Sequence, residues 1–485
     1  MTQLEHVPVG PIDPHRFKSV ISPADYAQLL ELIDHGAAAL HGRVIWNVNS
    51  TAKGGGVVEM LRPLLGYSRG SGVDARWVVI SGGPEFFVVT KRLHNHLHGS
   101  DGDGGALTAD ARQVYERTLA GNAGELARLV GPRDVVILHD PQTAGLLPAL
   151  QSTGALLIWR CHVGLDHANR SAREAWSFLR GYLVYAHACV FSRGEFSWEG
   201  LARDRIAVIQ PSIDVFSPKN AEQSDERRSA ILSKAGIVPL RQTVAPTFRH
   251  MDGTPGRVDR RADMCEVAPL SPEDRVVAQV SRWDRLKDPL GVLHGFVQHV
   301  ADRSEAHLLL AGPANEAVAD DPEGAQVYAE VLAAWQALPS GARARVHLAS
   351  LPMTDVEENA AMVNAVQRHA SVVVQKSLAE GFGLTVAEAM WKRRPVVAGR
   401  IGGIQDQIVD DVSGVLIGDP RDLRAFGAAV SGLLADEPRA TRIGIQAQER
   451  VRENFLGPHH LARYFELIER LTAGVQGSGV REHGR

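Results

Sequence analysis

The sequence has no apolar run of about 18 residues, the length that a membrane-spanning helix requires. Its first residues, MTQLEHVPVGPIDPHRF, lack both the basic start and the apolar stretch of a signal peptide. Cysteine is scarce: Cys161, Cys189 and Cys265 lie far apart, without the C-x-x-C spacing of zinc or redox sites. The sequence therefore predicts a cytoplasmic protein with no membrane partner, whose cysteines are small apolar core residues.

An excess of basic charge is missing as well. The formal net charge is -4, and charged residues make up 22% of the chain. Because a nucleic-acid partner requires a basic surface, we expect none. The 485 residues are too many for one ordinary core, so two or three domains are expected.

Short apolar runs rich in Val and Ile alternate with segments of helical period. Both faces of these runs are apolar, which is typical of strands in a parallel sheet. The runs occupy residues 43–50, 76–81, 134–140, 155–161 and 188–193, and then 275–282, 306–313, 345–350, 370–377, 394–400 and 413–419. The alternation predicts two doubly wound α/β domains, in which ligands bind outside the carboxyl ends of the strands.

The predicted domains cover residues 1–215 and 216–455, followed by a C-terminal segment, 456–485. A linker or insert is expected at 219–268. Residues 211–237 are predicted to be a linker followed by a helix. Residues 248–264 form either a plain loop, as Asp-Gly and Pro-Gly indicate, or a segment that folds over a site. The tail, 474–485, is predicted to be disordered.

A glycine-rich loop, Gly54 to Gly56, joins the first predicted strand to a helix that starts near Val57. Glycine lets a ligand approach the backbone, and the free amides of a helix start favour an anion. The pattern is neither a P-loop nor G-x-G-x-x-G. The alternative is a tight turn without a ligand.

The segment VSRWDRLKDP places Arg282 and Lys287 just after a strand of the second domain. Two cations there can hold a diphosphate and stabilise its charge as it leaves. The alternative is a solvated charged loop, and Asp284 and Arg285 are equally well explained as surface charges.

The segment EGFGLTVAE, residues 380–388, combines a glycine loop with a helix start. Thr385 and Glu388 fit the capping box T-x-x-E, which gives Glu388 a structural alternative to ligand binding. The amides at this helix start can face an anion. Glu380 lies before the helix, where its carboxylate can accept hydrogen bonds from sugar hydroxyls.

Two strand ends of the first domain carry mixed donors and acceptors that suit a polyhydroxylated ligand. A single His is more often structural, so both roles stay open. No compact metal spacing such as H-E-x-x-H occurs, and the sequence around Ser192 is not the G-x-S-x-G of a hydrolase. The residues are His139, Asp140 and Gln142 after one strand, and Arg160, His162 and Asp166 at the next.

Together these motifs resemble the retaining GT-B glycosyltransferases of family 4. More narrowly, WNVNSTAKGGGVVEML, HDPQTAGLLPAL, WRCHVGLD, DGTPGRVDRRAD, QVSRWDRLKDP and VVVQKSLAEGFGLTVAEAMW look like trehalose synthases of the glucosyl-transferring type. The resemblance implies two Rossmann-like domains facing each other across a cleft, with the final helix packed back on the first domain. Ser281 replaces the usual family glycine. Retaining trehalose phosphorylases share much of the pattern and are the nearest competitor.

The resemblance also implies roles for individual residues. In the second domain, Arg282 and Lys287 would clamp the diphosphate and Glu388 would bind the ribose. His162 would meet the donor sugar from the first domain. Apart from the resemblance, Leu351 follows a strand of the second domain and is a candidate for stacking on the base. Glu380 would hold the donor glucose together with the loop Gly381, Phe382, Gly383, Leu384 and Thr385. Gly55 and Gly56 would approach phosphate or acceptor, and the acceptor candidates are Asp140, Gln142, Arg160 and Asp166.

The implied reaction transfers glucose from an NDP-glucose to free glucose with retention and yields α,α-trehalose and NDP. No cofactor or bound metal is required, although Mg²⁺ can accompany the diphosphate, and a homodimer is the expected assembly. Three alternatives stay open. They are a trehalose phosphorylase, a family 4 enzyme with another acceptor, and a non-catalytic protein that binds nucleotide sugars.

Overall fold

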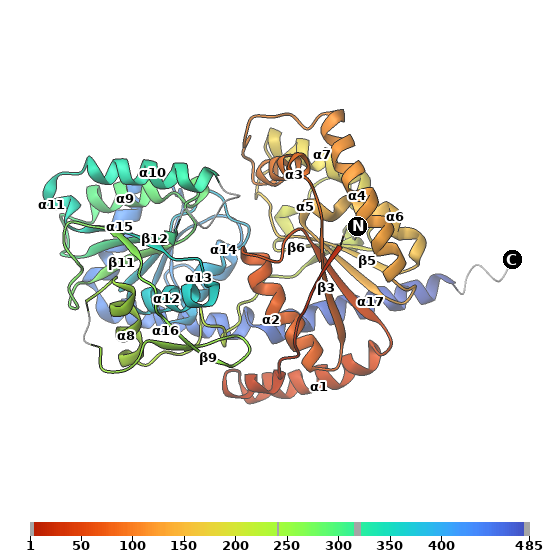
Figure 1. The fold of residues 1–485 in the computed structure, drawn as a ribbon, viewed down its shortest axis with the longest axis horizontal. Coiled ribbons are helices and arrows are strands. Elements are labelled where there is room, and N and C mark those ends of the chain that lie inside the picture. Colours follow the sequence, from red (N-terminus) through yellow and green to blue (C-terminus); the bar gives the residue numbers. More distant parts are fainter. Residues whose placement is uncertain (1–3, 240–241, 315–321, 480–485) are drawn as a thin grey trace. The chain divides into compact units, whose positions relative to one another are not determined.

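The computed structural model describes residues 4–239, 242–314 and 322–479 (Figure 1). The chain divides into two compact units. Unit 1 comprises Met1–Ser212 and Phe455–Arg485, and unit 2 comprises Ile213–Asn454. Within the described residues, no helix is long and apolar enough to cross a membrane.

Unit 1 is built on a seven-stranded sheet in the order β1-β3-β2-β4-β5-β6-β7. All neighbours pair in parallel except β1, which is antiparallel to β3. The chain goes from the central strand β2 outward to β3 and then returns to β4 on the other side, so β2 and β4 form the switch point where ligands bind in such sheets. The strands are β1 (Leu4–Val7), β2 (Val44–Asn49), β3 (Asp74–Ile80), β4 (Val135–His139), β5 (Leu156–Cys161), β6 (Ala188–Phe191) and β7 (Ile206–Val208).

Helices bury both faces of this sheet, as its apolar strands require. On one face, Phe465, Leu467 and Ile468 of the last helix pack against Ile45 and Val135 of the strands. This helix, α17, also contacts α1 and α2, which explains why the chain's last segment belongs to unit 1. The main helices are α1 (Pro23–Ala39), α2 (Gly56–Gly70), α3 (Pro84–Leu97), α4 (Ala109–Leu129), α7 (Arg170–Leu183) and α17 (Gly457–Gly479).

Unit 2 repeats the arrangement in the order β10-β13-β12-β11-β14-β15-β16, with β10 antiparallel at the edge. Its switch point lies between β11 and β14. The strands are β10 (Asp263–Cys265), β11 (Val276–Val280), β12 (His307–Pro313), β13 (Val346–Leu351), β14 (Val372–Gln375), β15 (Val396–Gly399) and β16 (Val415–Ile417). The main helices are α8 (Asp225–Ala235), α9 (Pro289–His299), α10 (Pro322–Gln336), α12 (Val356–His369), α13 (Leu384–Trp391), α15 (Leu423–Ala435) and α16 (Glu437–Asn454).

Every predicted apolar run contains a strand, and the predicted helix within 211–237 is α8. Of the two interpretations left open for residues 248–264, the plain loop is wrong. The segment forms a hairpin, β8 (Thr247–Arg249) and β9 (Pro255–Arg257), and then enters β10. The Asp-Gly turn that indicated a loop instead closes this hairpin, with the His250 amide donating to the Thr254 carbonyl at 2.9 Å.

The disorder predicted for 474–485 is also wrong as far as Gly479, because α17 continues to that residue. Residues 480–485 lie outside the described part of the chain. The three cysteines are unbridged. Cys161 and Cys189 are buried as predicted, whereas Cys265 is half-buried on the edge strand β10.

Candidate active site

At the switch point of unit 2, the motif that contains Arg282 and Lys287 lies beside the motif that contains Glu380. The segment Ser281 to Lys287 follows β11, and the segment Lys376 to Gly383 follows β14, its parallel neighbour. The Leu378 amide donates to the Leu286 carbonyl at 2.7 Å, which joins the two loops. Residues that are almost a hundred positions apart in the sequence therefore line one sheet edge.

Lys287 and Glu380 form the centre of this edge. The Lys287 ammonium is paired with Glu380 Oε2, and the two side chains are 18% and 10% exposed. Ser377 Oγ donates to the same carboxylate oxygen at 3.3 Å. Arg282 is more open, with a 53% exposed side chain that contacts Asp284 Oδ2 at 2.8 Å. The edge thus combines cationic donors with a carboxylate acceptor.

Asp284 and Arg285 have structural partners in this loop. Asp284 Oδ1 accepts from the Leu286 amide at 2.8 Å and starts the short helix η6 (Arg285–Lys287). Arg285 forms a bidentate pair with Glu330, at 2.8 and 2.6 Å. These partners explain both residues without a ligand.

The glycine loop that follows Glu380 is packed against a second glycine pair. The Gly403 amide donates to the Gly381 carbonyl at 3.2 Å. A Cβ on Gly402 would lie 1.8 Å from the Glu380 carbonyl oxygen, so only glycine fits there. The backbone on both sides of Glu380 is therefore fixed by close main-chain contacts.

The predicted capping box is wrong. Helix α13 begins at Leu384 and its N-cap is Gly383 at φ 86°, two residues before the expected cap Thr385, and no side chain caps the helix. Thr385 lies inside the first turn and cannot serve as the N-cap. A helix start without a side-chain cap leaves its amides for another acceptor, which suits a phosphate.

Glu388 is buried on α13 at 2% exposure. Its Oε1 lies 3.3 Å from the Lys219 ammonium. Its Oε2 is buried without a hydrogen bond from any described residue. A buried carboxylate oxygen without a donor is costly, which points to a ligand that supplies one.

The stacking role expected for Leu351 is not available. Leu351 is 1% exposed at the end of β13, where its side chain is part of the core. An important pair was missed by the sequence analysis. Lys376, fully buried, pairs with Asp288 and donates to the Pro420 carbonyl at 2.7 Å, tying the β14 loop to the β11 loop. Lys376 and Asp288 both lie in the motifs that follow β14 and β11, and this position is the sequence feature that could have indicated the pair.

In unit 1, the glycine loop lies where β2 ends. Gly54 and Gly55 have φ of 67° and 83°, a region that disfavours other residues, and α2 starts at Gly56 without a side-chain cap. The three glycines are exposed. The expected loop and helix start are therefore present at the switch point of this sheet.

A histidine pair occupies the neighbouring strand ends. His139 Nδ1 and His162 Nε2 are 3.0 Å apart, and His139 Nε2 lies 3.1 Å from Asn47 Oδ1. Since the amide oxygen of Asn47 only accepts, His139 donates to it from Nε2 and receives the His162 Nε2 proton at Nδ1. This order leaves Nδ1 of His162 as an acceptor toward a ligand.

Asp140 holds the main chain of this pair in place. Its Oδ1 accepts from the His162 amide at 2.8 Å, and its own φ is 63°. Burial raises the pKa of Asp140 to about 6, against the lowering effect of that hydrogen bond. The structure therefore brings Asp140 and His162 together, as predicted from their strand ends.

Arg160 does not join this group. It is fully buried, and its NH1 donates to the carbonyls of Ile209 at 2.6 Å and Phe191 at 3.2 Å, with NH2 near Ser192 Oγ at 3.3 Å. The acceptor-binding role expected for Arg160 is therefore corrected to a structural one.

Two further acceptor candidates lie in different surroundings. Asp166 pairs with Arg193 at 3.2 Å, and both side chains are mostly buried. Gln142 has a buried Oε1 without a hydrogen bond from any described residue.

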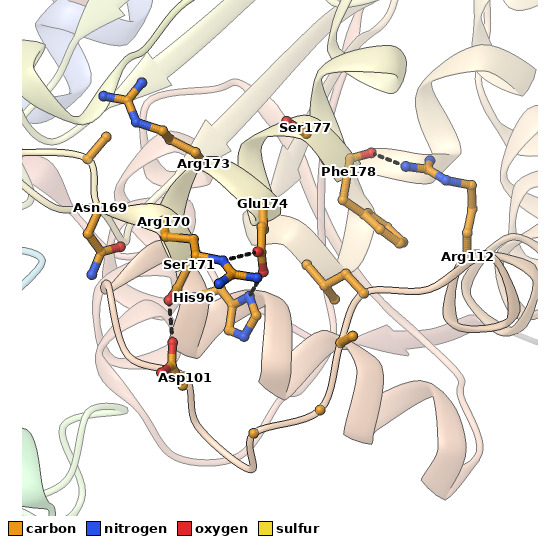
Figure 2. Close-up of a pocket in the computed structure, with 15 residues that line it drawn as sticks. His96, Asp101, Arg112, Asn169, Arg170, Ser171, Arg173, Glu174, Ser177 and Phe178 are labelled. Atoms are coloured by element: carbon orange, nitrogen blue, oxygen red, sulfur yellow. Dashed lines mark hydrogen bonds and ion pairs between the residues drawn. The ribbon is translucent and has the colours of Figure 1, made fainter.

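A polar pocket of about 1000 Å³ adjoins the loop that carries Asp166 (Figure 2). Its guanidinium groups are already engaged. Arg170 donates to Glu174 at 2.9 Å, and Arg173 donates to Glu199 at 2.6 Å. Arg112 donates to the Tyr182 hydroxyl at 2.7 Å and to the Phe178 carbonyl at 3.0 Å. Such a lining offers hydrogen bonds to neutral polar groups more readily than charge to a phosphate.

Two buried histidines, His139 and His460, and the half-buried His162 make the stability of unit 1 sensitive to acid. Burial, and next the nearby Arg160 charge, lowers the pKa of His139 to about 3 and lowers the pKa values of His162 and His460. Below about pH 6.5 the unfolded chain binds protons at these residues while the folded chain does not. Each histidine therefore lowers the free energy of unfolding by about 1.4 kcal/mol for every unit by which the pH is decreased. Asp140 opposes this between about pH 4 and 6, because its raised pKa makes the folded chain bind a proton.

We therefore expect the urea concentration at the unfolding midpoint of unit 1 to decrease when the pH is lowered from 7 to 5. His460→Gln should reduce this slope, because it removes one of the histidines whose pKa is lowered by burial. A midpoint that is constant over this range would contradict the assignment of neutral buried histidines.

Comparisons with known proteins agree with this architecture. Two family models match the chain: "Trehalose synthase, N-terminal domain" over residues 47–198 and "Glycosyl transferases group 1" over residues 265–450. The UDP-forming α,α-trehalose-phosphate synthase of Burkholderia xenovorans has a similar structure, with a TM-score of 0.65 at 14% identity, over 89% of this chain and 100% of that one. For sucrose-phosphate synthase of Thermosynechococcus elongatus the TM-score is 0.61 at 16% identity, with the same coverage. The fold and the family models define a glycosyltransferase of the GT-B fold.

Proteins with similar sequences show to which family of glycosyltransferases the chain belongs. The trehalose synthase of Rubrobacter xylanophilus is 34% identical over 94% of this chain and 96% of its own length, and that of Pyrococcus horikoshii is 33% identical over 94% and 95%. The trehalose phosphorylase of Pleurotus pulmonarius is 25% identical over 80% of this chain but only 52% of its own length. The chain belongs to the trehalose synthase family.

Proposed function

We propose that this enzyme transfers glucose from an NDP-glucose to the anomeric hydroxyl of free glucose, with retention, and produces α,α-trehalose and NDP. The observation that carries the proposal is the sheet edge of unit 2, where Lys287, Glu380 and the uncapped start of α13 lie together. A nucleotide sugar presents a diphosphate beside a set of hydroxyls, and this edge offers cations beside a carboxylate.

The donor is proposed to bind in three parts. Lys287 and Arg282 hold the diphosphate together with the amides at the start of α13. Glu380 accepts hydrogen bonds from the hydroxyls of the donor glucose. Glu388 accepts from the ribose hydroxyls at its unsatisfied Oε2. Gly381 and Gly383 keep the backbone close to the sugar.

The transfer is proposed to take place on one face of the donor sugar. The acceptor hydroxyl attacks the anomeric carbon as its bond to the phosphate oxygen breaks, and that oxygen takes the hydroxyl proton. Lys287, Arg282 and the α13 amides stabilise the charge that develops on the departing diphosphate. No pair of carboxylates flanking the scissile bond, as in a glycosidase, is required.

Unit 1 is proposed to supply the acceptor contacts. His162, with Nδ1 open as an acceptor, is assigned to the donor glucose, and Asp140 and Gln142 to the acceptor glucose. Gly55 and Gly56 are assigned to the approach of phosphate or acceptor. Asp166 remains an acceptor candidate in its pair with Arg193.

A trehalose phosphorylase is the second candidate, because phosphorylases are among the relatives. In that reaction inorganic phosphate replaces NDP, and glucose 1-phosphate is the activated sugar. The ribose contact of Glu388 would then have no purpose. The buried, unsatisfied Oε2 of Glu388 favours the nucleotide reaction.

Product analysis decides between these reactions. The protein is incubated with glucose and UDP-, ADP- or GDP-glucose, and separately with trehalose and either phosphate or the three diphosphates. Trehalose formed from one or more of the NDP-glucoses supports the proposal. Glucose 1-phosphate formed from trehalose and phosphate, without transfer from any NDP-glucose, would replace it with the phosphorylase.

Three further proposals concern cofactors and assembly. The transfer requires no cofactor, Mg²⁺ accompanies the diphosphate without being essential, and the protein is a homodimer. Activity measured in EDTA and the mass measured by light scattering test them directly.

A further inference from the structure

The segment that opens unit 2 is fastened to the helices beside Glu388. Asn364 of α12 donates to the carbonyls of Pro218 at 3.0 Å and Ala221 at 2.8 Å. Arg368 of the same helix donates to the carbonyls of Asn220 and Ala221, both at 3.2 Å. Four main-chain contacts thus fix the short stretch that carries Lys219.

Lys219 projects from this stretch to Glu388. Its ammonium lies 3.3 Å from Glu388 Oε1, and the two side chains are 18% and 3% exposed. An ionised carboxylate that is this deeply buried requires a charged partner or several donors. Oε2 of the same carboxylate has no donor among the described residues. The pair therefore occupies one oxygen of Glu388 and leaves the other for a ligand.

Lys392 is the other ammonium close to Glu388, and it has different partners. It contacts Asn220 Oδ1 at 2.9 Å, Gln367 Oε1 at 2.7 Å and the main-chain carbonyl of Glu388 at 3.1 Å. Burial lowers the pKa of Lys392 well below its ordinary value. Its three contacts are all with uncharged oxygens, whereas Lys219 contacts the Glu388 carboxylate itself.

We propose that Lys219 is a positioning residue for the nucleotide ribose. By pairing with Oε1 it fixes the rotation of the Glu388 carboxylate, so that Oε2 accepts from the ribose hydroxyls. Lys219 acts through Glu388 and has no contact with the substrate in this role. The inference rests on the proposed function, because it requires a nucleotide donor.

The test compares ribose-containing and ribose-modified nucleotides. The wild-type protein is titrated calorimetrically with UDP, ADP and GDP, and the tightest of the three is used together with its 2′,3′-dideoxy form. Lys219→Met is expected to weaken binding of the natural diphosphate by about tenfold to a hundredfold. It should change binding of the dideoxy form less than about twofold, because the contact that Lys219 supports is already missing.

Two variants serve as controls. Lys219→Arg keeps the charge and should restore binding to within a few-fold of the wild-type protein. Lys234→Met removes a half-buried lysine of α8 in the same unit and should have no effect. Thermal unfolding shows that each variant is folded, and Lys219→Gln, which keeps a polar side chain, is measured in place of Lys219→Met if the latter unfolds.

The possible outcomes separate this inference from the proposed function. Normal binding of the natural diphosphate by folded Lys219→Met or Lys219→Gln would overturn the inference. An equal loss of affinity for the dideoxy form would also overturn it, because Lys219 would then act on another part of the nucleotide or on the fold. If the wild-type protein binds none of the three diphosphates and forms no trehalose, the proposed function fails, and the inference fails with it.

Discussion

Replacing Lys287 by alanine is expected to lower kcat by about 10²–10³-fold, the effect of removing one preorganised donor from a developing oxyanion. Lys287 is the least exposed cation at the carboxyl edge of β11, and Glu380 Oε2 holds its ammonium in place. The diphosphate gains its charge as the bond to the sugar breaks, so the loss should appear in kcat more strongly than in KM. Steady-state rates with NDP-glucose as the varied substrate measure this separation.

Arg285→Ala is the matched control for Lys287→Ala. Arg285 lies two residues earlier on the same short helix, carries the same charge, and is committed to Glu330. Its removal should leave kcat within about twofold, since an exposed ion pair contributes little to the fold and Arg285 has no role at the edge. Equal losses in both variants, or near-normal turnover by folded Lys287→Ala, would refute the assignment of Lys287 to the diphosphate.

The parallel strands could be predicted because the residues of each strand by themselves indicate that the strand is buried. A strand covered on both faces must be apolar at every position, and β4, with all five residues buried, is an example. The edge strands β1, β7 and β10 could not be predicted in this way. In β1 the two central residues, Glu5 and His6, are exposed, and only four residues pair with β3. So short and polar an edge strand looks like a loop until its neighbour is known.

The candidate site shows the same division. The position of Lys287 and Glu380 could be predicted because each follows a predicted strand, and parallel topology brings such ends to one edge. The start of α13 could not be placed, because the choice between Gly383 and Thr385 as N-cap depends on the contact of the glycine loop with Gly402 and Gly403. No local pattern indicates this long-range contact.

Arg160 shows where a pattern at a strand end is misleading. It lies on β5 directly before Cys161 and His162, and its polarity favours a ligand role. Successive residues of a strand point to opposite faces, however, and a residue inside the strand faces a covering layer rather than the edge. There the long side chain donates to two main-chain carbonyls at the ends of the neighbouring strands, those of Phe191 and Ile209.

Arg160→Met is therefore expected to destabilise unit 1 by about 3 kcal/mol. Methionine retains much of the apolar stem, so the loss arises from the buried oxygens of Ile209 and Ser192, which lose the Arg160 donor. The Phe191 carbonyl loses Arg160 but still accepts from the Ile209 amide at 2.9 Å. Relief of the buried charge offsets part of the loss, since burial lowers the pKa of Arg160. Hydrogen exchange of the β6 amides in urea measures the change within unit 1 and does not require the whole chain to unfold in one step.

Arg205→Met tests whether the loss at Arg160 depends on burial. Arg205 also donates to a main-chain carbonyl of unit 1, that of Val184 at 2.9 Å, but it is exposed, so water replaces the lost donor and the change should stay within about 0.5 kcal/mol. The KM for glucose measured with the folded fraction of Arg160→Met separates the two roles of Arg160. A KM close to that of the wild-type protein, together with faster exchange in β6, establishes the structural role. A large rise in KM with unchanged exchange would return Arg160 to the acceptor site.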